Sequence, residues 1–173
     1  MNMTERATFF GPPHAIRTAV HRHQYPGLNS RLDELHAAVL RDALLPRLDA
    51  LTARRTAIAA RYRQEIRHPL LRLPEPAAGS TSVWHLFPVL VAPGRRAAFV
   101  RHLAAHDVDC GFHYPALIPE QPALLAYGRF AVDGELPRAR DFAANQVSLP
   151  AHPFLDAAEE DHVIACCNAW REG

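Results

Sequence analysis

The sequence predicts an α/β fold, in which a long bent helix is followed by a small sheet covered by helices. Helical segments alternate along the chain with short apolar segments rich in β-branched and aromatic residues. Pro46 falls between two of the helical segments, and hydrophobic residues make up 49% of the 173 residues against 21% charged. A chain of this length and composition can bury one core.

The first helix is expected over residues 30–45. Ser30 is a suitable N-cap residue, and the first backbone N–H groups that follow it suit an anion such as phosphate. One apolar face is formed by residues that recur at helical spacing, namely Leu32, Leu35 and Val39. Pro46 should then end or kink this helix.

A second helix is expected over residues 47–66. Its inward stripe should consist of Leu48, Leu51, Ile58, Tyr62 and Ile66. Four arginines fall mostly on the opposite side, namely Arg54, Arg55, Arg61 and Arg63. We interpret this arginine run as a solvated helix face.

Three short strands are expected downstream, at residues 82–91, 108–113 and 146–150, because these segments are apolar and rich in residues that favour strands. Pro88 within the first of them favours an edge position or a bulge. Helices are expected at residues 95–106, 136–144 and 156–170, and a Pro-rich loop at residues 114–125.

Charge and hydropathy exclude several classes of function. The formal net charge of +1 at pH 7 gives no electrostatic case for binding nucleic acid or an anionic membrane. No apolar run reaches the length of a membrane span, and the N-terminus lacks the apolar core of a signal peptide. The expected location is therefore cytoplasmic.

The cysteines predict neither a disulfide framework nor a metal site. There are three of them, an odd number, and Cys166 and Cys167 are neighbours, so we expect reduced thiols buried on a helix. His106, Cys110 and His113 are ligand types for zinc, but the two histidines fall on different predicted elements and a fourth ligand would have to come from elsewhere. No metal site is predicted.

Several stretches of the chain carry the pattern of one enzyme family. Residues 27–40 read G-x-N-S-R-L-D-E-L-x-A-A-x-L, and residues 45–62 continue with a helix–proline–helix pattern. Residues 82–87, residues 111–115 with Gln121 and Pro122, and residues 147–153 look like the family's H-L-F strand, its H-Y-P…Q-P loop and its S-L-P-x-H-P strand end. Together they resemble the pyridoxal-phosphate-dependent nucleotide-sugar aminotransferases of the DegT/StrS kind, over nearly everything from Gly27 onward.

The resemblance implies the small, C-terminal domain of the aspartate-aminotransferase fold (fold type I). Residues 1–26 would then be a poorly defined N-terminal segment, residues 27–68 the bent linking helices, and residues 69–173 an α/β small domain. In this family a large domain covers the linking helix. The apolar face of residues 30–45 should therefore be exposed in this chain.

The resemblance also assigns candidate site residues. In the family, the residue matching Asn29 reaches the cofactor phosphate of the neighbouring subunit. The substrate-binding candidates are His113 and Tyr114 on the predicted loop, and His85, for which the alternative is a histidine packed within the sheet. Two positions depart from the family pattern: His36 stands where glutamine is usual, and Pro119 where a second loop histidine is common.

The chain contains no lysine, because all 19 of its Lys and Arg residues are arginine. Arginine stays protonated and cannot form a Schiff base, whereas pyridoxal phosphate chemistry needs a lysine amine. The chain alone therefore cannot be a standard transaminase, and it offers no predicted catalytic residue. Pyridoxal phosphate is expected only together with a partner chain.

Three functions remain open at this point. The chain could complete the site of a separate large-domain chain, in sugar amination for polysaccharide or deoxysugar biosynthesis. It could instead be a non-catalytic binding or regulatory partner of an intact homologue, or a truncated and inactive relic. The expected partners are a large-domain or intact aminotransferase chain, or a second copy in a homo-oligomer such as a dimer, with a nucleotide sugar as substrate.

Overall fold

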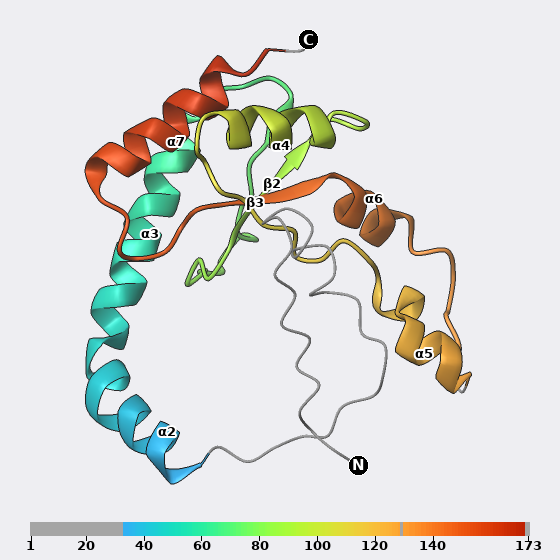
Figure 1. Ribbon diagram of the computed structural model, residues 1–173, viewed down its shortest axis with the longest axis horizontal. Coiled ribbons are helices and arrows are strands. Elements are labelled where there is room, and N and C mark those ends of the chain that lie inside the picture. Colours follow the sequence, from blue (N-terminus) through green and yellow to red (C-terminus); the bar gives the residue numbers. More distant parts are fainter. Residues whose placement is uncertain (1–32, 129, 172–173) are drawn as a thin grey trace.

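A three-stranded antiparallel sheet lies at the centre of the fold (Figure 1), in a computed structural model that describes residues 33–128 and 130–171. Its strand order is β1 (Leu71–Arg72), β2 (Phe87–Val91) and β3 (Gln146–Leu149). β2 is the central strand. The predicted α/β fold with a small sheet is confirmed.

The predicted strands are only partly present. The strand predicted over residues 82–91 is shortened to β2, and the one predicted over residues 146–150 is β3. The strand predicted over residues 108–113 is wrong, because this segment contributes a single bridge between Gly111 and Ser148. Sequence patterns did not indicate β1, since two residues are too few to show a period.

Helices flank this sheet on several sides (Figure 1). They are α3 (Leu48–Glu65), α4 (Arg96–Ala105), α6 (Pro137–Asn145) and α7 (Ala157–Ala169), whereas α5 (Pro122–Tyr127) lies apart from the sheet. All except α5 match predicted helices to within a few residues. The loop prediction for residues 114–125 is wrong where α5 begins, since Pro122 occupies the first turn of a helix, where a missing N–H costs no hydrogen bond.

The core lies between β2, β3 and the helices α3, α4 and α7. Phe87, Val89 and Val91 of β2 are buried, as the two-residue period of a strand requires. The helices contribute further buried side chains, among them Ile58, Tyr62, Phe99, Leu103, Val163 and Cys167. Tyr62 meets the ring of Phe87 edge-on, at 5.3 Å between centroids, and its hydroxyl donates a hydrogen bond of 2.9 Å to the carbonyl of Pro150.

β2 is the central strand of the sheet, but at Pro88 it has a paired strand on one side only, so Pro88 lies at a local edge, as predicted. β1 pairs with β2 only at Leu90 and Val91, so β1 does not extend as far as Pro88 on that side of the strand. On the other side Pro88 faces Ser148, whose own N–H and C=O are bonded instead to Gly111 at 2.8 and 3.0 Å. No ladder bond therefore needs the N–H that proline lacks.

A bent helical arm leads into the domain and projects away from the sheet (Figure 1). It consists of α2 (Glu34–Val39), a π-helical turn (Leu40–Leu44) and a 3₁₀ turn (Leu45–Arg47), after which α3 begins. Pro46 lies in the 3₁₀ turn, so the proline interrupts the α-helix without ending the helical path. The observed N-cap is Asp33, whose carboxylate accepts a 2.8 Å bond from His36 N–H, whereas the predicted cap Ser30 lies outside the described residues.

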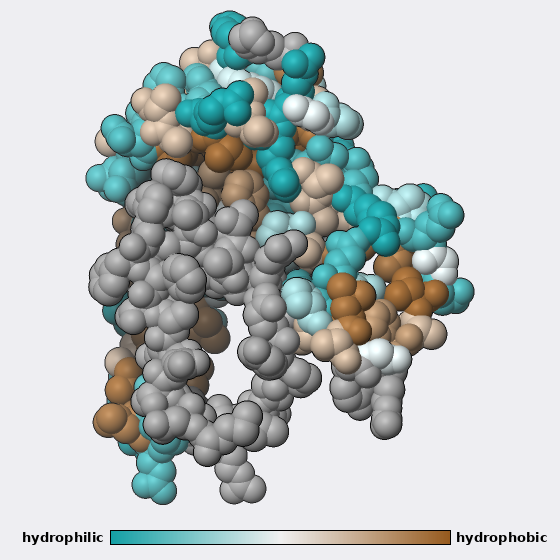
Figure 2. All heavy atoms as spheres, turned by 45° about the vertical axis from the view of Figure 1, so that its right-hand side comes forward, coloured by the Kyte–Doolittle hydropathy of each residue, from teal (hydrophilic) through white to brown (hydrophobic). Residues whose placement is uncertain are grey.

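The apolar face of this arm is exposed, as predicted. Leu35 is 74% exposed and Val39 50% exposed. The predicted inward stripe of the next helix is correct only from Ile58 onward, because Leu48 is also exposed and Leu51 is only half-buried. This half of α3 extends beyond the sheet, and apolar side chains are visible on the surface at the α2 end of the molecule (Figure 2).

The solvated-face interpretation of the arginine run is wrong for two of its members. Arg54 and Arg61 are partly buried, and both pair with Glu160 of α7, whose side chain is 4% exposed. Arg54 also donates to the carbonyl of Leu155, and Arg61 to Asp161 and Glu65. The ion pairs of these arginines therefore stabilise the packing of α3 on α7. The periodicity of a single helix cannot show contacts with another helix.

All three cysteines are free thiols and buried, which confirms that prediction. Burial raises the pKa of the Cys167 thiol to about 12. Within residues 33–128 and 130–171, every helix is too short or too polar to cross a membrane.

Candidate functional site

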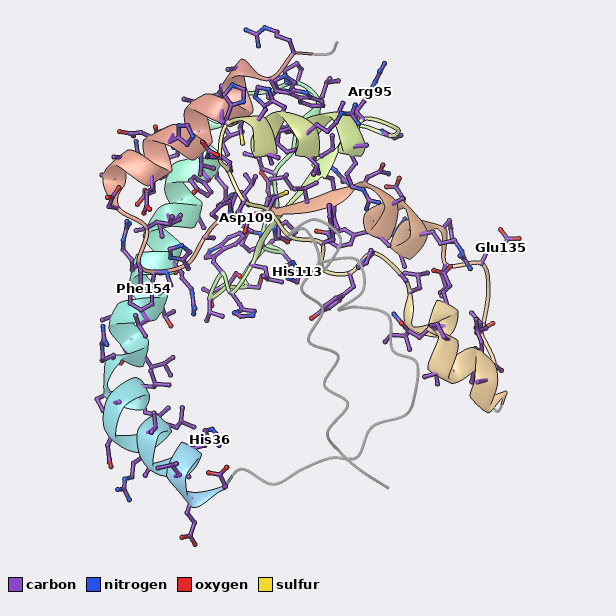
Figure 3. The ribbon with its side chains drawn as sticks, in the orientation of Figure 1. His36, Arg95, Asp109, His113, Glu135 and Phe154 are labelled. Carbon is purple, nitrogen blue, oxygen red and sulfur yellow. The ribbon has the colours of Figure 1, made fainter. Side chains whose placement is uncertain are left out.

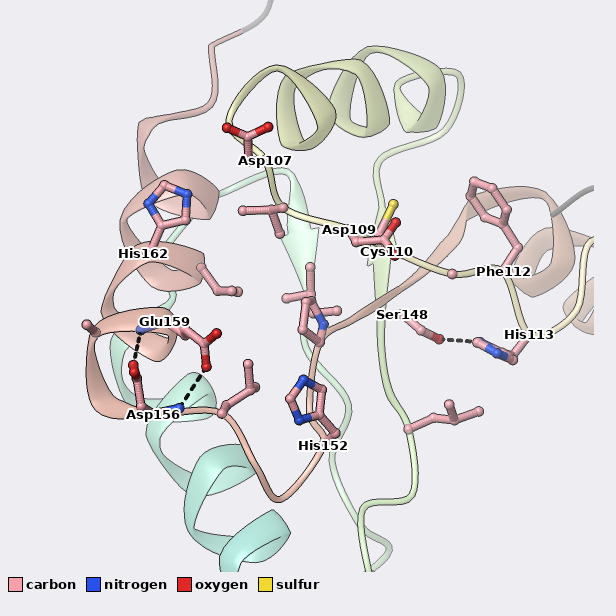
Figure 4. A pocket seen from close by; sticks show the side chains of 18 residues that line it. Asp107, Asp109, Cys110, Phe112, His113, Ser148, His152, Asp156, Glu159 and His162 are labelled. Atoms are coloured by element: carbon pink, nitrogen blue, oxygen red, sulfur yellow. Dashed lines mark hydrogen bonds between the residues drawn. The ribbon is translucent and has the colours of Figure 1, made fainter. Parts of the chain in front are cut away.

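A cavity of about 810 Å³ opens between the N-terminal half of α7, the end of β3 and the segment after α4 (Figure 4). Three stretches line it: residues 107–113, residues 148–152 and residues 155–163, together with Leu86. Residues more than 40 positions apart in the sequence therefore meet at one concave surface, which is the usual form of a small-molecule site.

His113 is held in this cavity by β3. Its Nδ1 lies 2.9 Å from the Ser148 hydroxyl (Figure 4). That hydroxyl donates in turn towards the side-chain oxygen of Gln146 at 3.4 Å. Nδ1 of His113 and the Ser148 hydroxyl are therefore joined by a hydrogen bond, and Nε2 is the other ring nitrogen that can donate or accept. β3 thus fixes the place of the loop histidine.

Gly111 makes this arrangement possible. It exchanges two main-chain bonds with Ser148, which anchors the segment along β3. A Cβ placed on Gly111 would lie 2.7 Å from Cε1 of His113, closer than such atoms approach one another. The absence of a side chain at Gly111 therefore lets the imidazole lie back against β3.

The N-terminus of α7 forms another wall of the cavity. Asp156 accepts a 2.8 Å bond from Glu159 N–H, and Glu159 accepts one of 2.8 Å from Asp156 N–H, which is a capping box. Two backbone N–H groups at the N-terminus of α7 are thus bonded to carboxylates, and this wall of the cavity is acidic. It is therefore unsuited to binding a phosphate group, although helix N-termini often do so.

The polar lining of the cavity consists of carboxylates, imidazoles and a hydroxyl, with no arginine among its residues. Carboxylates accept hydrogen bonds, and imidazoles and hydroxyls both donate and accept them. These groups match the hydroxyls of a sugar better than an anionic group. The apolar part of the lining, such as Leu149 and Val163, provides a surface for the carbon skeleton.

The remaining predicted site residues lie elsewhere. Tyr114 is exposed, and its ring packs against His113 at 5.6 Å between centroids. His85 is exposed on the loop before β2, so the alternative of a histidine packed within the sheet is wrong; its neighbour Leu86 lines the cavity. His36 lies on the arm, far from His113 (Figure 3), and bonds to Asp33. Asn29 lies outside the described residues.

Sequence reasoning missed Ser148, Gln146 and His152 as site residues. Ser148 and His152 belong to the strand-end motif at residues 147–153, and both line the cavity. The sequence pattern does not show that these side chains meet the loop that carries His113. The pairing of β3 with Gly111 makes that connection, and it is a tertiary feature.

Comparison with known proteins identifies the family. The model of the DegT/DnrJ/EryC1/StrS aminotransferase family matches residues 7–168. The chain belongs to this family. The family's solved structures share the fold, and its members are pyridoxal-phosphate-dependent aminotransferases of fold type I.

Two sugar transaminases illustrate the similarity. The dTDP-3-amino-3,4,6-trideoxy-alpha-D-glucose transaminase of Streptomyces venezuelae is 40% identical over 87% of this chain. The dTDP-3-amino-3,6-dideoxy-alpha-D-galactopyranose transaminase of Aneurinibacillus thermoaerophilus is 35% identical over 84% of this chain. In each case the match covers 38% of the relative's length.

Structural comparison gives the same partial coverage. The crystal structure of DesV from S. venezuelae, in complex with a ketimine intermediate, superposes with a TM-score of 0.73 at 39% identity. The match covers 87% of this chain and 39% of DesV. The chain thus spans well under half the length of the relatives it matches.

The residues of this chain do not fit covalent attachment of the family's cofactor. None of the 173 residues is a lysine, so no side-chain amine can form a Schiff base. Among the described residues, no arginine lines the 810 Å³ cavity, and its carboxylates do not favour a cofactor phosphate.

Proposed function

We propose that this chain supplies the small-domain side of a nucleotide-sugar aminotransferase site, which a lysine-bearing large-domain chain completes. The observation that carries the proposal is the loop histidine His113, which Ser148 orients inside a cavity of suitable size. An imidazole ring nitrogen can donate a hydrogen bond to a sugar hydroxyl or accept one from it.

The charge of the cavity supports a role towards the sugar rather than towards phosphate. Its carboxylates and imidazoles can bond to several hydroxyls, and its α7 wall is acidic. A nucleotide diphosphate would therefore point away from this wall, towards cations on another surface. We propose that His113 and the adjacent Tyr114 contact the sugar ring, and that Asn29 contacts the cofactor phosphate of the partner.

The exposed arm supports the need for a partner. Its apolar side chains project away from the sheet and pack on none of the domain's core elements. An apolar face of this kind on a helix is typical of a surface that another domain covers. We propose that the large domain of the lysine-bearing chain is the domain that covers it, with residues 27–68 acting as the link to the small domain at residues 69–173.

The test is an activity assay with and without a partner. The full chain is mixed with a large-domain chain that contains the Schiff-base lysine, and the absorbance of the aldimine and the transfer of an amino group to a keto-sugar nucleotide are measured. We expect both signals only in the mixture. His113→Asn should lower kcat/KM by roughly 2- to 10-fold, since one hydrogen bond between neutral groups contributes about 0.5–1.5 kcal/mol.

His85→Asn is the matched control for His113→Asn. It should have a smaller effect on kcat/KM, because His85 lies outside the cavity lining. A further variant, Asn29→Ala, should weaken cofactor retention in the mixture. Complex formation without amino transfer would reject the enzyme proposal and favour a non-catalytic binding or regulatory partner. Absence of both would favour an inactive relic.

A further inference from the structure

The helices α4 and α7 bring three metal-ligating side chains together at their contact. His102 and His106 lie one turn apart on α4, and Cys166 lies opposite them on α7. One ring nitrogen of each histidine and the Cys166 sulfur all lie within 4.8 Å of one another. Within the described part of the chain, no other group of three His, Cys, Asp or Glu side chains meets in this way.

Main-chain carbonyls orient both imidazoles. Nε2 of His102 lies 2.9 Å from the carbonyl oxygen of Cys166, and Nδ1 of His106 lies 2.8 Å from that of His102. A carbonyl oxygen only accepts, so each of these nitrogens carries the proton, and the other nitrogen of each neutral ring has the lone pair. Binding of a metal through the other two nitrogens, Nδ1 of His102 and Nε2 of His106, would keep both carbonyls as outer partners, as is usual for zinc-binding histidines.

We propose that His102, His106 and Cys166 bind a zinc ion between α4 and α7, with water as the fourth ligand on the side where His106 is exposed. Two imidazoles and one thiolate suit a borderline-soft cation such as Zn²⁺, and not Mg²⁺ or Ca²⁺, which prefer oxygen. Bonds of about 2.0–2.3 Å in a tetrahedron place ligand atoms roughly 3–4 Å apart, so modest side-chain rotations complete the site.

The alternative of a reactive cysteine does not fit this cluster. Cys166 is buried, and desolvation raises the pKa of its thiol, whereas an activated nucleophile has a lowered pKa and an accessible sulfur. A divalent cation at this point would supply the charge that makes a thiolate favourable.

The zinc ion would brace α4 against α7 beside the cavity. His162, one turn before Cys166 on α7, donates a 2.7 Å bond to the carbonyl of His106, and His162 also lines the cavity. The proposed zinc ligands are different residues from His113 and Ser148. Zinc binding therefore does not depend on the aminotransferase proposal.

The experiment uses the full 173-residue chain after treatment with a chelator. Zn²⁺ is titrated in competition with a chromogenic chelator, Co²⁺ is added to a second sample for its absorption spectrum, and thermal unfolding is followed with and without Zn²⁺. We expect one zinc ion per chain, a sulfur-to-cobalt charge-transfer band and a higher unfolding midpoint with Zn²⁺, since a ligand that binds only the folded state stabilises it.

The variants decide whether this cluster is the site. His106→Asn and Cys166→Ser should weaken zinc binding by more than the roughly 10- to 100-fold that loss of an outer-shell partner costs. His106 is exposed, so its variant should leave the core intact even if Cys166→Ser fails to fold. Cys110→Ser and Cys167→Ser should keep wild-type affinity, because neither cysteine belongs to the cluster. No zinc binding, unchanged affinity in His106→Asn, or a cobalt spectrum without the sulfur band would overturn the proposal.

Discussion

At the residue scale, a glycine determines how the candidate site is built. Replacing Gly111 with alanine should push the ring of His113 off Ser148, because the new Cβ would lie 2.7 Å from Cε1. The ring is only half-buried and can move, so the free energy of unfolding should fall by less than about 1 kcal/mol. The measurement is the ¹H–¹⁵N spectrum of the His113 ring, in which the Nδ1 chemical shift should change as its hydrogen bond to Ser148 is lost.

A second variant separates sterics from hydrogen bonding. Ser148→Ala removes the hydrogen-bond partner of Nδ1 without adding an atom near the ring, so it should produce the same change of the Nδ1 chemical shift as Gly111→Ala. A ring spectrum that stays like wild type in both variants would show that β3 does not orient His113.

At the scale of elements, the packing of α3 on α7 depends on a buried carboxylate. Glu160→Gln should lower the free energy of unfolding by about 1–3 kcal/mol, because it leaves Arg54 and Arg61 beside a neutral side chain. The expected loss is less than for a fully buried pair, since both arginines are about one-third exposed and water screens them. Urea denaturation of the two proteins measures the difference.

Glu75→Gln is the matched control. It makes the same change in a pair with Arg63 that is 3.8 Å long and exposed, so its effect should stay within about 0.5 kcal/mol. Equal losses in the two variants would mean that the α3–α7 contact does not depend on Glu160.

At the scale of the whole molecule, the exposed arm should determine association. Val39→Glu should weaken binding of the lysine-bearing large-domain chain by roughly tenfold or more, equivalent to about 1.4 kcal/mol, because a carboxylate would be buried in an apolar interface. Val132→Glu makes the same change at a similarly exposed valine, 43% against 50%, on a different segment and should leave binding unchanged. Sedimentation velocity of each mixture gives the affinities.

A chain that stays monomeric at high concentration and also fails to bind the large-domain chain would contradict this prediction. So would equal affinities for the Val39→Glu and Val132→Glu variants. Either result would mean that the arm's apolar side chains tolerate water without a partner, as scattered surface residues often do.

Local patterns in the sequence were enough to predict the α/β class and most helices. Helical spacing and proline positions depend on neighbours within one or two turns, so α3, α4, α6 and α7 could be placed closely. The absence of lysine was equally accessible, because it is a property of composition and limits the chemistry of any fold. The family pattern added the loop histidine, His113, which the structure places in the cavity.

Tertiary structure decided what those side chains contact. Helical periodicity predicts solvated side chains for Arg54 and Arg61, but in the structure both pair with Glu160 of α7. The bonds that Ser148 exchanges with Gly111 are likewise contacts between distant segments. The cluster of His102, His106 and Cys166 joins two helices about 60 residues apart. Spacing along one chain reports neighbours on one element, whereas charge pairs, strand ladders and metal ligands join different elements, and only packing brings these together.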